Sequence, residues 1–114
     1  MKEITAIIQP HTLSRVMHAL QALPQYPGAT VIPHVHGQGR GRGAGGAFLL
    51  TEEDIAFHDK TFLIVLCDSE RVDSIVSAIA QAARTGNKGD GLITVKDVAH
   101  VVRIRTFGTA RQAL

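Results

Sequence analysis

The chain has 114 residues and a formal net charge of +2, a length that corresponds to one domain. Hydrophobic residues make up 45% of it, as in an ordinary globular fold, and so mild a positive charge does not by itself imply nucleic acid. The single cysteine excludes an internal disulfide, and no apolar stretch nears the roughly 20 residues of a membrane span, so a soluble cytoplasmic protein is expected.

The first part of the chain predicts a strand, a helix and a second strand. Residues 2–9 alternate apolar side chains, and Pro10 ends this strand. Apolar residues at helical spacing then predict an amphipathic helix over residues 11–23. Residues 29–36 form a short segment rich in β-branched side chains, which predicts the second strand. Pro33 within them predicts an edge position or a β-bulge, because proline cannot donate to a ladder.

A long insertion follows at about residues 37–57. Glycine occupies six of the ten positions from Gly37 to Gly46, and ordering glycine costs more backbone entropy than ordering any other residue. A loop of this length in a small domain is usually functional or disordered.

The second half of the chain predicts strand, helix, strand and a final extended segment. Residues 60–67 are a continuous apolar run typical of a buried strand, which makes its last residue, Cys67, a buried thiol. Residues 69–85 predict a helix, capped by Asp68 or Ser69. Residues 92–95 predict a short strand, and residues 100–107 alternate again as an extended piece.

The order of these elements is the βαββαβ pattern of the ferredoxin-like fold, an α+β sandwich formed by one domain over residues 1–114. One face of its sheet would carry both helices. The other face would stay bare, which invites an oligomer to cover it.

Two loops together suggest a phosphate site. Residues 85–91 contain three glycines whose backbone N–H groups can face an anion, and Arg103 and Arg105 would point the same way from a strand. Paired guanidinium groups suit a polyphosphate, because each can bind two oxygens. The alternative is that both arginines are solvated or pair with a carboxylate of Asp54, Asp59 or Asp90. A P-loop is absent, and the formal GxGxxG match at residues 41–46 lacks a following long helix.

Two further motifs have simpler explanations. His34 and His36 would share one face of a strand and could bind a metal with His58, although ordinary surface histidines explain them better. Arg40 and Arg42 among glycines resemble RNA-binding segments, but one tyrosine and no tryptophan leave few stacking platforms, so no direct nucleic-acid partner is expected. No nucleophile–base pair stands out, so no catalytic residues and no enzyme activity are predicted.

Residues 83–106 read ARTGNKGDGLITVKDVAHVVRIRT. This segment resembles the C-terminal signature of the PII (nitrogen regulatory P-II) signal-transduction family, in which a helix end is followed by TG, GDG, a strand and RIRT. The first 20 residues resemble the family's first strand and helix, and VHGQGRGRG stands where the family has VxGxGRxxG at the base of its long T-loop. The resemblance covers nearly the whole chain and identifies a divergent, PII-like member.

The resemblance implies a homotrimer of ferredoxin-like subunits that binds an adenine nucleotide (ADP, ATP or AMP) in the clefts between subunits. It implies a T-loop at about residues 37–59, which docks on a target such as a membrane transporter or a regulator, and a B-loop at about residues 85–92. The nucleotide-binding positions that it carries over are Gly37, Gly39, Arg40, Lys60, Gly89, Asp90, Gly91, Arg103 and Arg105. The last two would come from the neighbouring subunit.

Two positions depart from the family pattern. Gly41 replaces a glutamine that helps to bind magnesium and 2-oxoglutarate, which argues against both of these ligands. Leu92 replaces a lysine, so the terminal phosphate meets less positive charge, and ADP or AMP is expected to compete with ATP. The alternative function is a metal-responsive PII-like regulator in which His34 and His36 bind Zn²⁺ or Cu²⁺ near the T-loop root.

Overall fold

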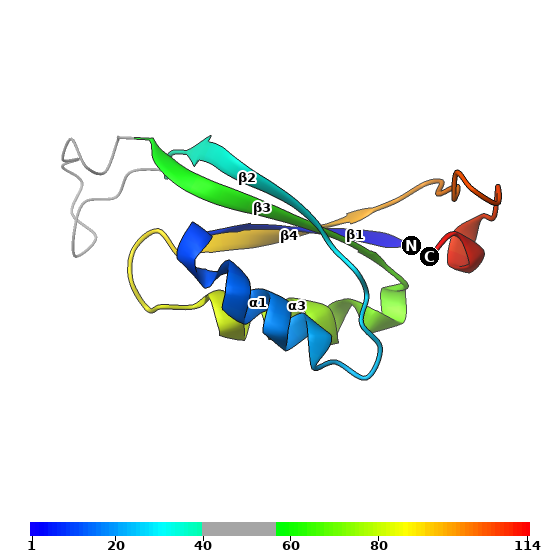
Figure 1. Ribbon diagram of the computed structural model, residues 1–114, viewed down its shortest axis with the longest axis horizontal. Coiled ribbons are helices and arrows are strands. Elements are labelled where there is room, and N and C mark those ends of the chain that lie inside the picture. Colours follow the sequence, from blue (N-terminus) through cyan, green and yellow to red (C-terminus); the bar gives the residue numbers. More distant parts are fainter. Residues whose placement is uncertain (40–56) are drawn as a thin grey trace.

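The computed structural model describes residues 1–39 and 57–114 as a four-stranded antiparallel sheet with two helices on one face (Figure 1). Residues 40–56 lie outside the described part, and with them Arg40, Gly41 and Arg42. The elements are β1 (Lys2–Ile8), α1 (Leu13–Gln21), β2 (Thr30–Gly37), β3 (His58–Cys67), α3 (Val72–Ala83) and β4 (Gly91–Asp97).

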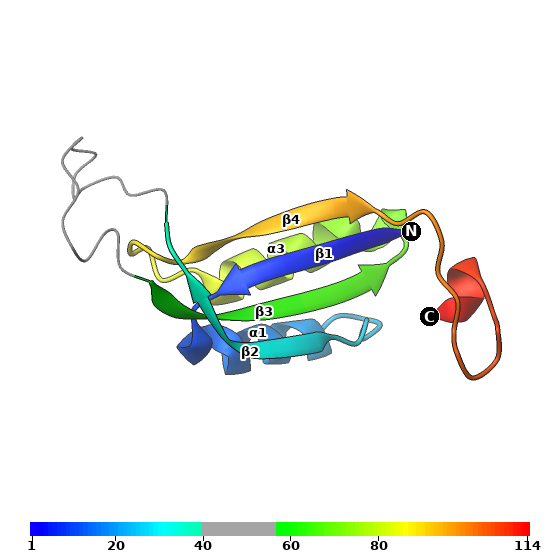
Figure 2. The same ribbon diagram turned by 90° about the horizontal axis from the view of Figure 1, so that it is seen from above.

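The strand order β2-β3-β1-β4 confirms the predicted ferredoxin-like fold. Both helices lie behind the sheet when it is viewed from above (Figure 2). A 3-10 turn precedes each helix, η1 at Pro10–Thr12 and η3 at Ser69–Arg71. Strand β2 extends to Gly37 and β3 begins at His58, so the strands continue into both ends of the predicted T-loop and leave residues 38–57 between them.

The core lies between the sheet and the helices. Alternate residues of β1 and β3 face the helices and are fully buried, as the strand periodicity predicts. The largest of these and their helical partners are Ile4, Ile8, Leu63, Val65, Val16, Leu20, Ile75 and Ile79. Cys67 is 1% exposed, which confirms the expected buried thiol, and this burial raises the pKa of the thiol.

Strand β2 is an edge strand and also has a β-bulge, the two alternatives that Pro33 predicted. Its pairing register with β3 shifts between Ile32 and Val35, and His34 has a left-handed φ of 59°. The regular alternation that would place His34 and His36 on one face is therefore interrupted at the bulge.

The predicted extended segment at residues 100–107 is wrong. Residues 104–106 form a turn, in which the Phe107 N–H donates to the Arg103 carbonyl and the Arg103 N–H to the Gly108 carbonyl, both at 2.8 Å. The chain leaves the sheet after Asp97, so an alternating sequence has no adjacent strand there to pair with. Beyond the turn, η4 (Ala110–Ala113) ends the fold.

The predicted side-chain cap of the second helix is also wrong. Neither η3 nor α3 has a side-chain hydrogen bond at its N-cap, and the Asp68 carbonyl accepts the Arg71 N–H at 3.0 Å. The Asp68 carboxylate instead meets the Arg111 Nε at 3.1 Å. The Asp68 side chain, which the sequence predicted as a helix cap, therefore forms a long-range ion pair with Arg111.

The sheet face opposite the helices is open, as predicted. Side chains directly opposite one another across antiparallel strands share a face. The pairing register therefore places one apolar row across all four strands, formed by Ile32, Phe62, Ile7 and Leu92. Ile32 is 43% exposed and Leu92 is 56% exposed. This set of four residues is called the apolar row below.

Candidate functional site

Three of the predicted nucleotide-binding residues converge at one end of the sheet. The Lys60 Nζ donates to the Gly89 carbonyl at 2.6 Å, which ties β3 to the B-loop. Gly37 lies against the same side chain, because a Cβ built on it would stand 3.0 Å from the Lys60 Cγ. Gln9 was not among the residues predicted from the sequence. Its amide nitrogen would lie 3.6 Å from a Cβ built on Gly89. Gln9 follows β1 directly, and only the paired strands bring it beside the B-loop.

The B-loop is closed by the side chain of Asp90. Its Oδ2 accepts the backbone N–H groups of Thr85 and Gly86, both at 2.9 Å, and its Oδ1 accepts the Thr85 hydroxyl. The Thr85 Oγ1 in turn accepts the Asn87 N–H at 3.1 Å. Gly86 and Gly89 have φ values of 85° and 89°, which glycine adopts without strain.

These hydrogen bonds have an electrostatic consequence. The Thr85 side chain is the first cause that holds the pKa of Asp90 below its ordinary value of 3.8, followed by the Thr85 backbone. A carboxyl whose pKa is lowered by folding stabilises the fold at pH values above its ordinary pKa. That contribution is lost as the pH falls through the lowered pKa, so it is fully present across the neutral range.

Gly91 fills a steric role at the start of β4. Its φ is 100°, and a Cβ built on it would stand 1.7 Å from the carbonyl oxygen of Ile7. Strand β4 therefore passes too close to β1 for any side chain at this position. The need for glycine at position 91 comes from strand pairing and could not be predicted from the GDG motif.

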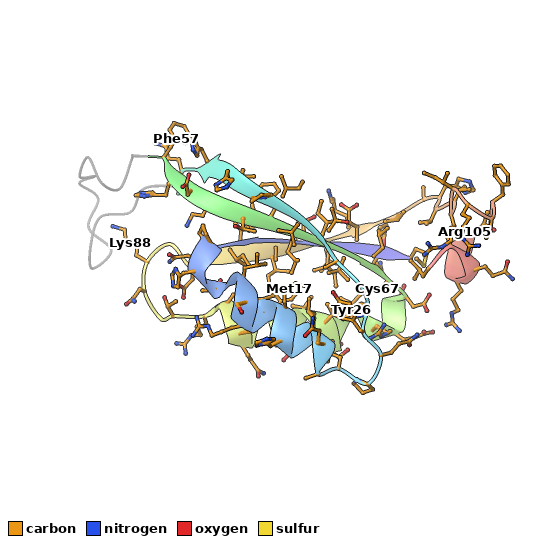
Figure 3. All side chains as sticks on the ribbon, in the orientation of Figure 1. Met17, Tyr26, Phe57, Cys67, Lys88 and Arg105 are labelled. Carbon is orange, nitrogen blue, oxygen red and sulfur yellow. The ribbon has the colours of Figure 1, made fainter. Side chains whose placement is uncertain are left out.

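Arg103 and Arg105 lie at the opposite end of the molecule. Figure 3 shows Arg105 beyond the end of the sheet, whereas Lys88 of the B-loop lies at the other end. The Arg103 Nη2 donates to the Leu114 carbonyl at 3.0 Å. One copy of the chain therefore separates the predicted site into two groups. We call them the B-loop half-site (Gly37, Lys60 and Gly89) and the arginine half-site (Arg103 and Arg105).

A groove of about 870 Å³ contains the arginine half-site. Its other walls include Gly28 before β2, Thr30 at the start of β2, Ile64 and Leu66 on the open sheet face, and Val102. The alternation of β3 indicates that Ile64 and Leu66 face away from the helices. It does not predict a groove, because the groove forms only where the C-terminal segment folds back.

Arg111 holds that C-terminal segment in place. Its Nε lies 3.1 Å from an Asp68 carboxylate oxygen, and its Nη2 lies 3.0 Å from a Glu70 carboxylate oxygen. Both acidic residues precede α3, so this double contact fixes η4 against the junction of β3 and α3. No signal in the tail sequence reveals this pairing.

The histidines give little support to the metal-responsive alternative. The His36 Nε2 lies 3.1 Å from an Asp59 carboxylate oxygen across the β2–β3 ladder, with both side chains exposed. Within residues 1–39 and 57–114, no three histidine, cysteine or acidic residues are grouped so that they could hold a metal ion. A metal site at the T-loop root is therefore not favoured.

Comparison with known proteins identifies the family. The model of the family "Nitrogen regulatory protein P-II" matches residues 1–107. The nitrogen regulatory protein P-II of Rhizobium etli is 42% identical over 114 residues, 100% of each chain. P-II 2 of Methanothermobacter thermautotrophicus is 39% identical over 114 residues, which is 100% of this chain and 97% of that protein.

A solved structure agrees with these relatives. The crystal structure of Arabidopsis thaliana PII bound to citrate superposes with a TM-score of 0.79 and 30% identity, over 99% of this chain and 91% of that one. In the described part of the chain, no helix is long and apolar enough to cross a membrane. The chain belongs to the nitrogen regulatory P-II family, whose members are regulatory signal transducers and not enzymes.

Proposed function

We propose that this P-II protein is a cytoplasmic homotrimer that binds an adenine nucleotide in the clefts between its subunits. The bound nucleotide controls the docking of the T-loop on a target protein, such as a transporter or another regulator. A ligand can shift such an equilibrium only by binding one state of the loop root more tightly than another.

The separation of the two half-sites carries this proposal. The B-loop half-site offers backbone donors and the Lys60 ammonium, while the arginine half-site offers two guanidinium groups and an apolar groove. These groups together suit a nucleotide, with phosphates on the donors and the base against the apolar wall. Because one copy holds them at opposite ends, a complete site needs the arginines of a second copy.

The open sheet face supports the assembly. The apolar row crosses all four strands on the side that the helices leave uncovered. Packing of this face against other subunits would remove the row from water, a favourable change of roughly 25 cal/mol for each Å² of apolar surface.

The charge near the phosphates sets the expected nucleotide preference. Lys60 is a cation of the B-loop half-site, while Leu92, two residues after Asp90, adds an apolar side chain to the open face. Because Leu92 replaces the lysine of the family pattern, the positive charge near the terminal phosphate is smaller, which favours ADP or AMP in competition with ATP. Since Gly41 has no side-chain oxygen, neither Mg²⁺ nor 2-oxoglutarate is expected to strengthen binding.

A thermal-shift panel tests the function. A ligand that binds only the folded protein raises the melting temperature. We expect ADP, AMP and ATP each to raise it, and 2-oxoglutarate with Mg²⁺ and ATP to add nothing further. Citrate and inorganic phosphate serve as anion controls without a base. If no adenine nucleotide raises the melting temperature above these controls, the proposed function is wrong.

Replacing Arg103 by alanine should weaken nucleotide binding by about 1.5–3 kcal/mol, the usual contribution of a hydrogen bond to a charged group. Calorimetric titration with ADP measures the change. Arg15, exposed on α1 on the helix side of the sheet, provides the matched control, since Arg15→Ala removes the same charge elsewhere. Equal affinities of Arg103→Ala and Arg15→Ala would exclude Arg103 from the cleft.

A further inference from the structure

We infer that Asp90 and Thr85 are positioning residues that fix the shape of the B-loop for phosphate binding, and that Asp90 is not itself a ligand. This inference rests on the proposed nucleotide site. It assigns to Asp90 a role that differs from the phosphate contact implied by its place in the GDG motif.

The Asp90 carboxylate is bound by donors of its own loop. It accepts three hydrogen bonds, from the Thr85 N–H, the Gly86 N–H and the Thr85 hydroxyl. The same hydroxyl oxygen accepts the Asn87 N–H. Three consecutive backbone donors, at residues 85, 86 and 87, are therefore used within the loop and are not available to a phosphate.

The charge of Asp90 leads to the same conclusion. A carboxylate turned toward a phosphate would repel it, whereas here the negative charge is held by donors of its own loop. The Lys60 Nζ holds the Gly89 carbonyl one residue before Asp90. The loop is thus held at two adjacent residues, by the Asp90 carboxylate and by the Lys60 ammonium from β3.

Two substitutions at position 90 separate positioning from direct binding. In Asp90→Asn, the amide oxygen can accept the two backbone N–H groups while the amide nitrogen donates to the Thr85 hydroxyl oxygen. This variant keeps the loop geometry and removes the charge. Asp90→Ala removes all three hydrogen bonds. A positioning role predicts that only Asp90→Ala is severely impaired.

Thr85 supplies an independent pair of variants. Thr85→Val keeps the size and β-branching of the side chain but cannot donate to Asp90 or accept from Asn87. Thr85→Ser keeps the hydroxyl. Thr85→Ser should therefore retain the nucleotide affinity that Thr85→Val loses. If side-chain size mattered and the hydroxyl did not, Thr85→Ser would instead be the weaker binder.

The test compares the affinities of the five proteins for ADP and for adenosine, which lacks phosphates. We expect Asp90→Ala and Thr85→Val to bind ADP about tenfold or more weakly than the unmodified protein. Asp90→Asn and Thr85→Ser should remain within about threefold of it, and affinities for adenosine should stay unchanged. Retained ADP affinity in Asp90→Ala would overturn the inference. So would Asp90→Asn binding as weakly as Asp90→Ala, because the charge itself would then be required.

Amide hydrogen exchange distinguishes this inference from the proposed function. The amides of Thr85, Gly86 and Asn87 should be protected in the unmodified protein and in Asp90→Asn, without any nucleotide present, and unprotected in Asp90→Ala. Protected amides in a protein that binds no nucleotide would leave the loop closure correct, but would refute both a positioning role for phosphate and the nucleotide site. Rapid exchange in the unmodified protein, with nucleotide binding intact, would refute the inference alone.

Discussion

Gly91→Ala is expected to destabilise the protein by about 3 kcal/mol or more, a large effect for the addition of one methyl group. The new Cβ would lie 1.7 Å from the Ile7 carbonyl oxygen, a backbone atom that cannot move aside without disturbing β1. Strand β1 is paired with β3 as well as with β4, so the displacement would reach the centre of the sheet. Urea unfolding measures the change in the free energy of unfolding.

Gly28→Ala is the matched control for this prediction. Gly28 also has a positive φ, of 74°, but a Cβ on it would meet nothing within 4 Å. Only the conformational cost of a left-handed alanine remains, about 1–2 kcal/mol. Equal losses of stability in the two variants would show that β4 can move away from β1 at no cost.

Phe62→Glu is expected to prevent assembly of the proposed trimer. Phe62 is the second member of the apolar row and lies directly opposite Ile32 on β2 and Ile7 on β1. A carboxylate buried there without a partner would cost several kcal/mol in each subunit. In one copy, Phe62 is only partly buried, so the isolated subunit should still fold. Analytical ultracentrifugation measures the assembly state, and circular dichroism measures the fold.

The control for this variant places the same charge on the other side of the sheet. Ala80 is exposed on α3, and Ala80→Glu should remain a trimer with normal nucleotide affinity. Phe62→Glu should lose nucleotide binding together with assembly, because each proposed site would draw on two subunits. A trimeric Phe62→Glu protein would show that the open face is not the contact.

Local sequence periodicity predicted the sheet and both helices, because each has one buried side. The alternation of residues 2–9 and the apolar run of residues 60–67 became the two central strands, and Pro33 marked the edge strand and its bulge. The same reasoning failed at residues 100–107. Alternation shows that a segment could pair, but pairing also needs a neighbouring strand, which the described part of one chain does not offer there.

The candidate site could be proposed from residue types in motif positions, but its contacts could not. Gly37, Lys60 and Gly89 were named from motif positions, and the fold brings them together. The contacts of Asp90 are hydrogen bonds inside a loop, and the steric constraint on Gly91 comes from the approach of β4 to β1. Asp68 likewise forms an ion pair with the distant Arg111, and it does not form the helix cap that was expected from the local sequence.

The separation of the two half-sites has a consequence for how assembly responds to ligand. If the arginines of each copy complete the B-loop half-site of the next, the contact is head-to-tail and only a closed ring satisfies every copy. A ring of three then has three complete sites, whereas an open pair has one. Nucleotide binding and subunit association must therefore strengthen each other. The apparent affinity for nucleotide should fall when the protein concentration is below the dissociation constant for subunit association.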